Sequence, residues 1–197
     1  MTEIRIYFEG HHGLREGFHA FLSEIVEGAR KRGLGFRLIA GEARAIRDFI
    51  KGMRDHSRAF NALLLDSECP DDGRLFERLH ERADWRPPAG IQVEPGQVCW
   101  MVQIMESWFL ADRPALKRFY GPGFHEASLP PNPHVEQIPK ADVLSGLKAA
   151  TRNTRAGEYR KGAHAPKILA RVDVAQLRDQ VPHCRRMFDS LLAKVNP

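Results

Sequence analysis

One stretch constrains the fold of this chain more than any other: the run Asn61–Leu65, which ends abruptly at Asp66-Ser67-Glu68. A continuous apolar run of this length, bounded by turn residues, is typical of a buried strand in a parallel sheet. Open α/β sheets bind their ligands at the carboxyl ends of such strands. Because alternate residues of a strand share a face, we expect Asp66 and Glu68 to project together at that end.

Paired carboxylates at a strand end suggest a cation site, because they repel each other unless a cation lies between them. Such oxygen ligands suit Mg²⁺ or Mn²⁺. A plain acidic turn is the alternative, since the residues 69–73 that follow are turn formers. A second strand, Ile4–Phe8, also ends in a carboxylate, that of Glu9. If the two strands are neighbours, Glu9, Asp66 and Glu68 meet at one edge of the sheet.

The bulk properties favour a single compact, cytoplasmic α/β domain without specifying its oligomeric state. The chain has 197 residues, a net charge of +5 and a pI near 9.3, a mildly basic balance that permits contact with nucleic acid without demanding it. Its three cysteines form no CxxC pair, which argues against a disulfide framework or a zinc knuckle. No signal peptide or membrane-spanning apolar stretch is present, so we expect no membrane partner.

The order of the expected elements indicates a parallel sheet. Apolar spacing predicts a helix over Leu14–Arg32, a strand over Phe36–Ala40 and a helix over Glu42–Met53. The resulting β-α-β-α-β order is typical of a right-handed, three-layer arrangement. Val98–Ile104 predicts a fourth strand that leads into a helix. Glu106 lies between this strand and the helix. It is either a further metal ligand or an acid in the first turn that complements the helix dipole.

The composition changes from residue 113 onwards, where prolines interrupt regular structure. Short helices are expected over residues 115–119, 141–150, 164–171 and 173–180, and a last helix from Pro182 to about Lys194. We therefore expect a core over residues 1–112 and a loop-rich, helical extension over 113–197. The extension should pack on the core within one structural domain.

A basic segment, Thr151–Lys161, lies within this extension. We expect it to be a mobile loop able to hold phosphates, with a plain solvated loop as the alternative. The candidate nucleic-acid contacts are Arg44, close to the loop after the second strand, and Arg152, Arg155, Arg160 and Lys161.

The pattern of Glu9-Gly10 after a first strand and Asp66-x-Glu68 after a third resembles the Toprim domain of topoisomerases, primases and OLD-type nucleases. The string Met101–Asp112, MVQIMESWFLAD, narrows the resemblance, together with Ile138-Pro139-Lys140 and Gly157–Gly162. Over essentially its whole length the chain is similar to a bacterial family of unknown function in the Toprim group. This resemblance implies a Toprim-like, mainly parallel α/β sheet flanked by helices, with a helical C-terminal extension.

The resemblance also implies an activity and a partner. Members of that family are often encoded beside an ABC-type or AAA-type ATPase in loci suspected of phage defence. OLD-type relatives use Toprim carboxylates to hold one or two divalent metals and to cut nucleic acid. If the Toprim pattern applies to this chain, Glu9, Asp66 and Glu68 match the catalytic metal ligands, and Glu106 is an additional ligand. Lys161 and Lys140 are candidates for a catalytic lysine.

One position departs from the OLD-type pattern. OLD-type sequences often carry another acid shortly after the first Glu, whereas Gly13 stands there in this chain. Glu16 is the nearest acid, and only a helix would bring it back toward the site.

The function predicted from these residues is metal-dependent hydrolysis of DNA or RNA. A metal would neutralise the scissile phosphate and activate water, Glu9 would bind metal or act as a base, and Lys161 or Arg160 would stabilise the oxyanion. The chain has no GxxxxGK[ST] sequence, so ATP use requires the partner. The main alternative is a non-catalytic binding or regulatory subunit of an ATPase complex. A metal-dependent phosphatase or nucleotide hydrolase is a further option.

Overall fold

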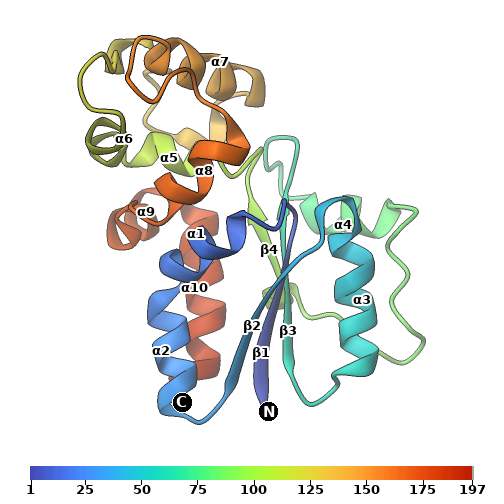
Figure 1. Cartoon of the computed structure of the whole chain (residues 1–197). Helices are drawn as coiled ribbons and strands as arrows, with labels where there is room; N and C mark the ends of the chain where they lie inside the picture. Colours follow the sequence, from blue (N-terminus) through green and yellow to red (C-terminus); the bar gives the residue numbers. More distant parts are fainter. Residues whose placement is uncertain (197) are drawn as a thin grey trace.

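The fold is built on a four-stranded sheet, seen in a computed structural model that describes residues 1–196 (Figure 1). Every pair of neighbouring strands is parallel, in the order β2-β1-β3-β4. The strands are β1 (Glu3–Phe8), β2 (Gly35–Ala40), β3 (Phe60–Asp66) and β4 (Val98–Met101). The α/β class expected from the sequence is confirmed. The strand order reverses between β1 and β3, the place where open α/β sheets bind ligands.

Helices cover both faces of the sheet and its carboxyl end (Figure 1). One face carries α1 (Leu14–Phe21), α2 (Ser23–Lys31) and α10 (Pro182–Val195), and the other carries α3 (Ala45–Asp55) and α4 (Leu75–Glu81). A helical lobe beyond the carboxyl end of the sheet comprises α5 (Ser107–Ala111), α6 (Arg113–Tyr120), α7 (Lys140–Thr151), α8 (Lys161–Leu169) and α9 (Val174–Gln180). Single 3-10 turns are η1 (Glu42–Arg44), η2 (Pro95–Gln97), η3 (Glu126–Ser128) and η4 (Val135–Gln137).

The central strands are buried on both faces, as the apolar run in β3 predicts. Leu64 packs in the core cluster under α1, α2 and α10, while Leu63 and Leu65 pack in the cluster under α3. Tyr7 of β1 shares the second cluster and lies against α3 at Gly52. A Cβ atom on Gly52 would lie 1.9 Å from the Tyr7 hydroxyl oxygen, so only glycine allows this approach of helix to sheet.

Several boundaries differ from those predicted; α8, for example, begins at Lys161 rather than at residue 164. The helix expected over Leu14–Arg32 is divided at Leu22, whose φ of −97° and ψ of 20° are not helical. The division is a local bend, because the Leu22 N–H still reaches the Phe18 carbonyl at 2.9 Å. β4 ends at Met101, earlier than expected, and Gln103 has a positive φ of 58°. The chain therefore turns sharply before it enters α5.

The C-terminal extension shares the core of the N-terminal segment. Leu191 of α10 is buried in the same cluster as Ile25 of α2 and Met101 of β4. Helices α1 and α8 meet at Gly17, where a Cβ atom would lie 2.6 Å from the Pro166 carbonyl oxygen. This close approach fixes α8 beside the carboxyl end of the sheet. Within residues 1–196, no helix combines the length and the apolar character needed to cross a membrane.

Candidate functional site

Four carboxylates, which we call the acid cluster, follow the strands at the carboxyl edge of the sheet: Glu9, Asp66, Glu68 and Glu106. Strands β1 and β3 are neighbours, as the sequence argument requires. Glu9 follows β1 directly and its N–H donates to the Leu64 carbonyl at 3.0 Å, which holds it against β3. Asp66 is the last residue of β3. The site therefore lies where the strand order reverses.

Asp66 and Glu106 form the buried part of the acid cluster, with 8% and 0% of the residue exposed. Asp66 Oδ1 accepts the Met105 N–H at 2.8 Å, and Glu106 Oε1 accepts the Tyr159 hydroxyl at 2.9 Å. The ammonium of Lys161 stands 3.6 Å from Asp66 Oδ2 and 3.4 Å from Glu106 Oε2. One cation thus serves two buried carboxylates, each of which is also fixed by one hydrogen bond.

Burial and mutual repulsion alter the proton affinities of the site. Burial raises the pKa of Asp66 from its ordinary 3.8 to about 7; Lys161 opposes this rise, and Glu106 and Glu9 add to it. Burial also raises the pKa of Glu9, and the charge of Glu68 adds to that effect. Burial lowers the pKa of Lys161, but Glu106 and Asp66 outweigh it, so the pKa is raised overall. Lys161 therefore stays protonated at neutral pH.

Glu68 does not share the environment of Asp66, contrary to the prediction from strand alternation. Its φ of 59° is left-handed, so the extended geometry ends before it. The Glu68 N–H donates to the Gln103 carbonyl at 3.0 Å, which ties this turn to the turn after β4. The exposed Glu68 side chain forms an ion pair with Lys140. The acid cluster accordingly has a buried half and a solvent-facing half.

The donor chemistry of the buried half fits a divalent cation. Carboxylate oxygens are the ligands that Mg²⁺ and Mn²⁺ prefer, and Glu106 Oε2 is buried without a hydrogen-bond partner. In the geometry described for residues 1–196, however, no three Asp, Glu, His or Cys side chains are close enough together to hold a metal ion. Lys161 is the cation between Asp66 and Glu106, so a metal would have to take its place.

The predicted nucleic-acid contacts are exposed arginines around this edge. Arg44 ends η1 after β2, and Arg152, Arg155 and Arg160 lie between α7 and α8. None of the four forms an ion pair with another residue in the described part of the chain. Their charges are therefore free to meet an anion.

The loop between α7 and α8, predicted to be mobile, contains internal hydrogen bonds. The Thr151 hydroxyl donates to the Leu147 carbonyl at 2.7 Å and accepts the Tyr159 N–H at 2.8 Å. The Thr154 hydroxyl donates to the Thr151 carbonyl at 2.8 Å. These buried bonds join the loop to the end of α7, and the side chains of Arg152, Arg155 and Arg160 are exposed.

Two further side chains lie near the site, of which Tyr159 was given no role from the sequence. Tyr159 is 3% exposed and supplies the hydroxyl that fixes Glu106. His11 accepts the Gly13 N–H at Nδ1, which leaves the proton of a neutral ring on Nε2. That Nε2 is buried without a partner and lies 3.9 Å from the position of a Cβ atom on Gly162, in the first turn of α8. The pair His11-His12 follows Glu9-Gly10 directly in the sequence, and this position had indicated that it could lie near a site.

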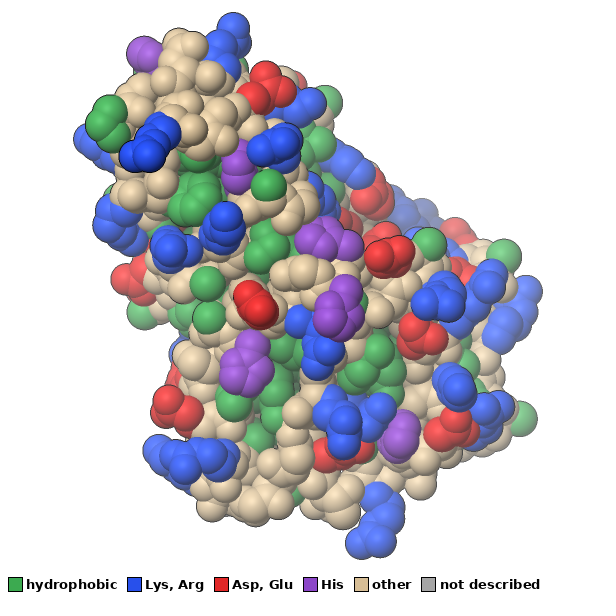
Figure 2. All heavy atoms as spheres, in the orientation of Figure 1, with side chains coloured by type: hydrophobic (Ala, Val, Ile, Leu, Met, Phe, Trp, Pro, Cys, Tyr) green, Lys and Arg blue, Asp and Glu red, His purple; other side chains and the backbone are tan. Residues whose placement is uncertain are grey.

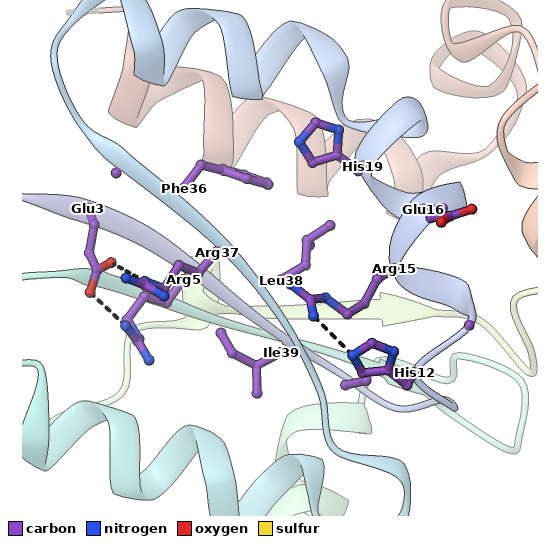
Figure 3. A pocket seen from close by; sticks show the side chains of 13 residues that line it. Glu3, Arg5, His12, Arg15, Glu16, His19, Phe36, Arg37, Leu38 and Ile39 are labelled. Carbon is purple, nitrogen blue, oxygen red and sulfur yellow. Dashed lines mark hydrogen bonds and ion pairs between the residues drawn. The ribbon is translucent and has the colours of Figure 1, made fainter.

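A large hollow of about 1030 Å³ lies along the outer edge of β2 rather than over Asp66 and Glu106 (Figure 3). Glu3 holds Arg5 and Arg37 at one end of it, and Arg15 bonds His12 at the other. Glu16, the nearest acid to the Gly13 position, lines this hollow. Glu3 forms ion pairs with Arg5 and Arg37, and no member of the acid cluster lines the hollow, so it adds no reactive group to the acid cluster.

Comparison with known proteins gives a single family. The model of DUF4276, a domain of unknown function, matches residues 14–192. This range includes Asp66, Glu68, Glu106 and Lys161 and begins after Glu9. No curated protein and no solved structure matches the chain. The resemblance to the Toprim group therefore stays a prediction.

Proposed function

We propose that this chain, which belongs to the DUF4276 family, is a metal-dependent nuclease that hydrolyses phosphodiester bonds at the acid cluster. The observation that carries the proposal is the buried pair Asp66 and Glu106 beside Lys161, next to Glu9 and at the point where the strand order reverses. Buried carboxylates are costly to a fold unless they are neutralised, and perturbed groups of this kind gather at functional sites.

The residues of the site suit distinct roles in hydrolysis. Asp66, Glu106 and Glu9 would hold Mg²⁺ or Mn²⁺, with Glu68 at the solvent side. When bound, the metal would neutralise the phosphate and favour ionisation of water. The raised pKa of Glu9 suits a base that accepts the proton of the attacking water at neutral pH. Lys161 would stabilise the charge that develops on the phosphate oxygens.

The charge distribution supports an anionic substrate at this edge. Residues 113–197 contain fifteen Lys and Arg against seven Asp and Glu, whereas residues 1–112 contain fifteen against eighteen. Figure 2 shows Lys and Arg outnumbering Asp and Glu over the helical lobe. A surface of this kind attracts the phosphate backbone of nucleic acid without regard to sequence. The exposed Arg152, Arg155 and Arg160 lie on the same lobe.

The proposal extends to a partner. The chain contains no phosphate-binding GxxxxGK[ST] loop, so any ATP-driven step would belong to another protein. The family resemblance suggests an ABC-type or AAA-type ATPase of a phage-defence system in that role.

The test is cleavage of labelled plasmid DNA, single-stranded DNA and RNA with Mg²⁺ or Mn²⁺. The wild type is compared with Asp66→Ala and Glu9→Ala, and with Asp142→Ala as the matched control. Asp142 is an exposed acid of α7 outside the acid cluster. We expect metal-dependent cutting that the first two substitutions abolish and the control retains. Cutting that survives Asp66→Ala would refute the assignment.

One observation favours a second candidate, a non-catalytic binding subunit of an ATPase complex. Lys161 already places a positive charge beside both Asp66 and Glu106, so the fold has an internal cation at this position without a metal. If the isolated chain cuts nothing, the same assay with the proposed ABC-type or AAA-type ATPase partner distinguishes the two candidates. Cutting in the mixture that requires Asp66 supports the nuclease, and continued inactivity supports the binding subunit.

A further inference from the structure

We propose that Lys161 is a displaceable internal counter-ion: its ammonium holds the cation position between Asp66 and Glu106, and a divalent metal must compete with it for that position. This inference rests on the metal site of the proposed function and adds a means of regulating it. Metal binding would be weaker than the carboxylates alone would allow.

Hydrogen bonds hold the carboxylates of Asp66 and Glu106 in position, so they need not move when a metal replaces the Lys161 ammonium. Asp66 uses Oδ1 for the Met105 N–H, and Glu106 uses Oε1 for the Tyr159 hydroxyl. The other oxygen of each carboxylate accepts no hydrogen bond in the described chain, and Lys161 is the one described cation within 4.0 Å of it. A metal that arrives at Oδ2 and Oε2 therefore breaks no fixed hydrogen bond.

The Lys161 side chain is held weakly enough to be displaced. Its distances of 3.6 and 3.4 Å to the two oxygens exceed the range of about 2.7–3.2 Å for a good N–H···O hydrogen bond, so charge rather than a directed bond holds it. Its side chain is 41% exposed, and it is the first residue of α8, so it can turn into solvent without disturbing the helix. The displaced ammonium would join the exposed Arg160, its neighbour in the chain, at the surface.

The experiment measures Mn²⁺ binding to the full chain, by the loss of the free-ion signal in electron paramagnetic resonance, with no substrate present. The wild type is compared with Lys161→Met and with Lys167→Met as the matched control. Lys167 is exposed on the same helix and forms no ion pair with any residue from 1 to 196. We expect Lys161→Met to bind Mn²⁺ about tenfold more tightly, a change of about 1.4 kcal/mol, and the control to match the wild type.

A second measurement on the wild type avoids any folding defect of Lys161→Met. Lysines carrying ¹³C-dimethyl labels are followed by NMR during a titration with Mg²⁺. We expect the Lys161 signal to move toward the position of a solvated lysine, whereas the Lys167 signal stays unchanged. An unchanged Lys161 signal at saturating Mg²⁺ would overturn the inference.

The outcomes separate this inference from the proposed function. Equal Mn²⁺ affinity of wild type and Lys161→Met overturns the counter-ion role, and metal-dependent cleavage by the same wild-type sample would leave the nuclease intact. Tighter binding by Lys161→Met supports the counter-ion role even if the wild type cuts no substrate, either alone or together with the ATPase, and that inactivity would refute only the nuclease. No binding by either protein overturns both.

Discussion

Replacing Asp66 by Asn should stabilise the metal-free protein at alkaline pH. Asp66 is 8% exposed, and its pKa of about 7 lies above the ordinary 3.8. Because the folded carboxyl keeps its proton to a higher pH than the unfolded one, the native state is favoured fully below pH 4. That advantage is lost as the pH rises to about 7. Asn keeps the oxygen that accepts the Met105 N–H but carries no charge.

The size of the effect follows from the two pKa values. The interval from 3.8 to about 7 corresponds to about 4 kcal/mol in the free energy of unfolding, at about 1.4 kcal/mol per pH unit. Linkage assigns about 2.5 kcal/mol of this to the range between pH 5 and pH 8. The stability of Asp66→Asn relative to wild type should increase by that amount over the range.

The assay is urea unfolding in EDTA at pH 5 and pH 8, with the exposed Asp142→Asn as the control that should follow the wild type at both pH values. Parallel behaviour of wild type and Asp66→Asn, within about 0.5 kcal/mol, would refute the reasoning. Saturating Mg²⁺ at pH 8 should stabilise the wild type and leave Asp66→Asn unchanged. Equal stabilisation of both would place the metal elsewhere.

Three further predictions concern the surroundings of the site. Tyr159→Phe should lower the free energy of unfolding by about 1–3 kcal/mol, because it leaves the buried Glu106 without its hydroxyl donor. Urea unfolding measures this change, and an unchanged midpoint would contradict the prediction. Gly17→Ala should cost about 1–3 kcal/mol by forcing α1 away from the α8 backbone, whereas Gly162→Ala, with nothing closer than 3.9 Å, should cost nothing; equal effects in thermal unfolding would count against the packing argument. Arg155→Ala should weaken the binding of labelled DNA or RNA and reduce the slope of log affinity against log salt by about 1; a slope equal to that of the wild type would remove this residue from the interface.

The order of elements and the convergence of acids followed from local patterns in the sequence. An apolar run that ends in a carboxylate predicts a buried parallel strand with a polar carboxyl end, and Ile4–Phe8 and Asn61–Leu65 both obey it. Once these strands are neighbours, Glu9 and Asp66 must meet at one edge, and the pairing of β1 with β3 confirms this. Asp173 stands at the start of the helix expected over residues 173–180, and Asp is a common N-cap residue. Its side chain accepts the Gln176 N–H, as an N-cap does.

The division of the acid cluster required the tertiary structure. Alternation along a strand would place the side chains of Asp66 and Glu68 on the same face. The left-handed φ of Glu68 ends that alternation, and it depends on the hydrogen bond from the Glu68 N–H to the Gln103 carbonyl, 35 positions further along the chain. Asp66 is then buried and Glu68 is exposed. This difference matters because a carboxylate keeps its ordinary proton affinity only while water or an opposite charge reaches it.

The sequence by itself therefore determined the α/β class, the parallel strands and the acids at their ends, because these depend on residues close together in the chain. Only the tertiary structure brought Lys161 to Asp66 and Glu106, which lie 95 and 55 positions earlier, and Tyr159 to Glu106, which lies 53 positions earlier. The approach of α8 depends on Gly17 against Pro166 and on the core that α10 shares with the sheet. No local pattern encodes such contacts, since they arise from the packing of whole helices.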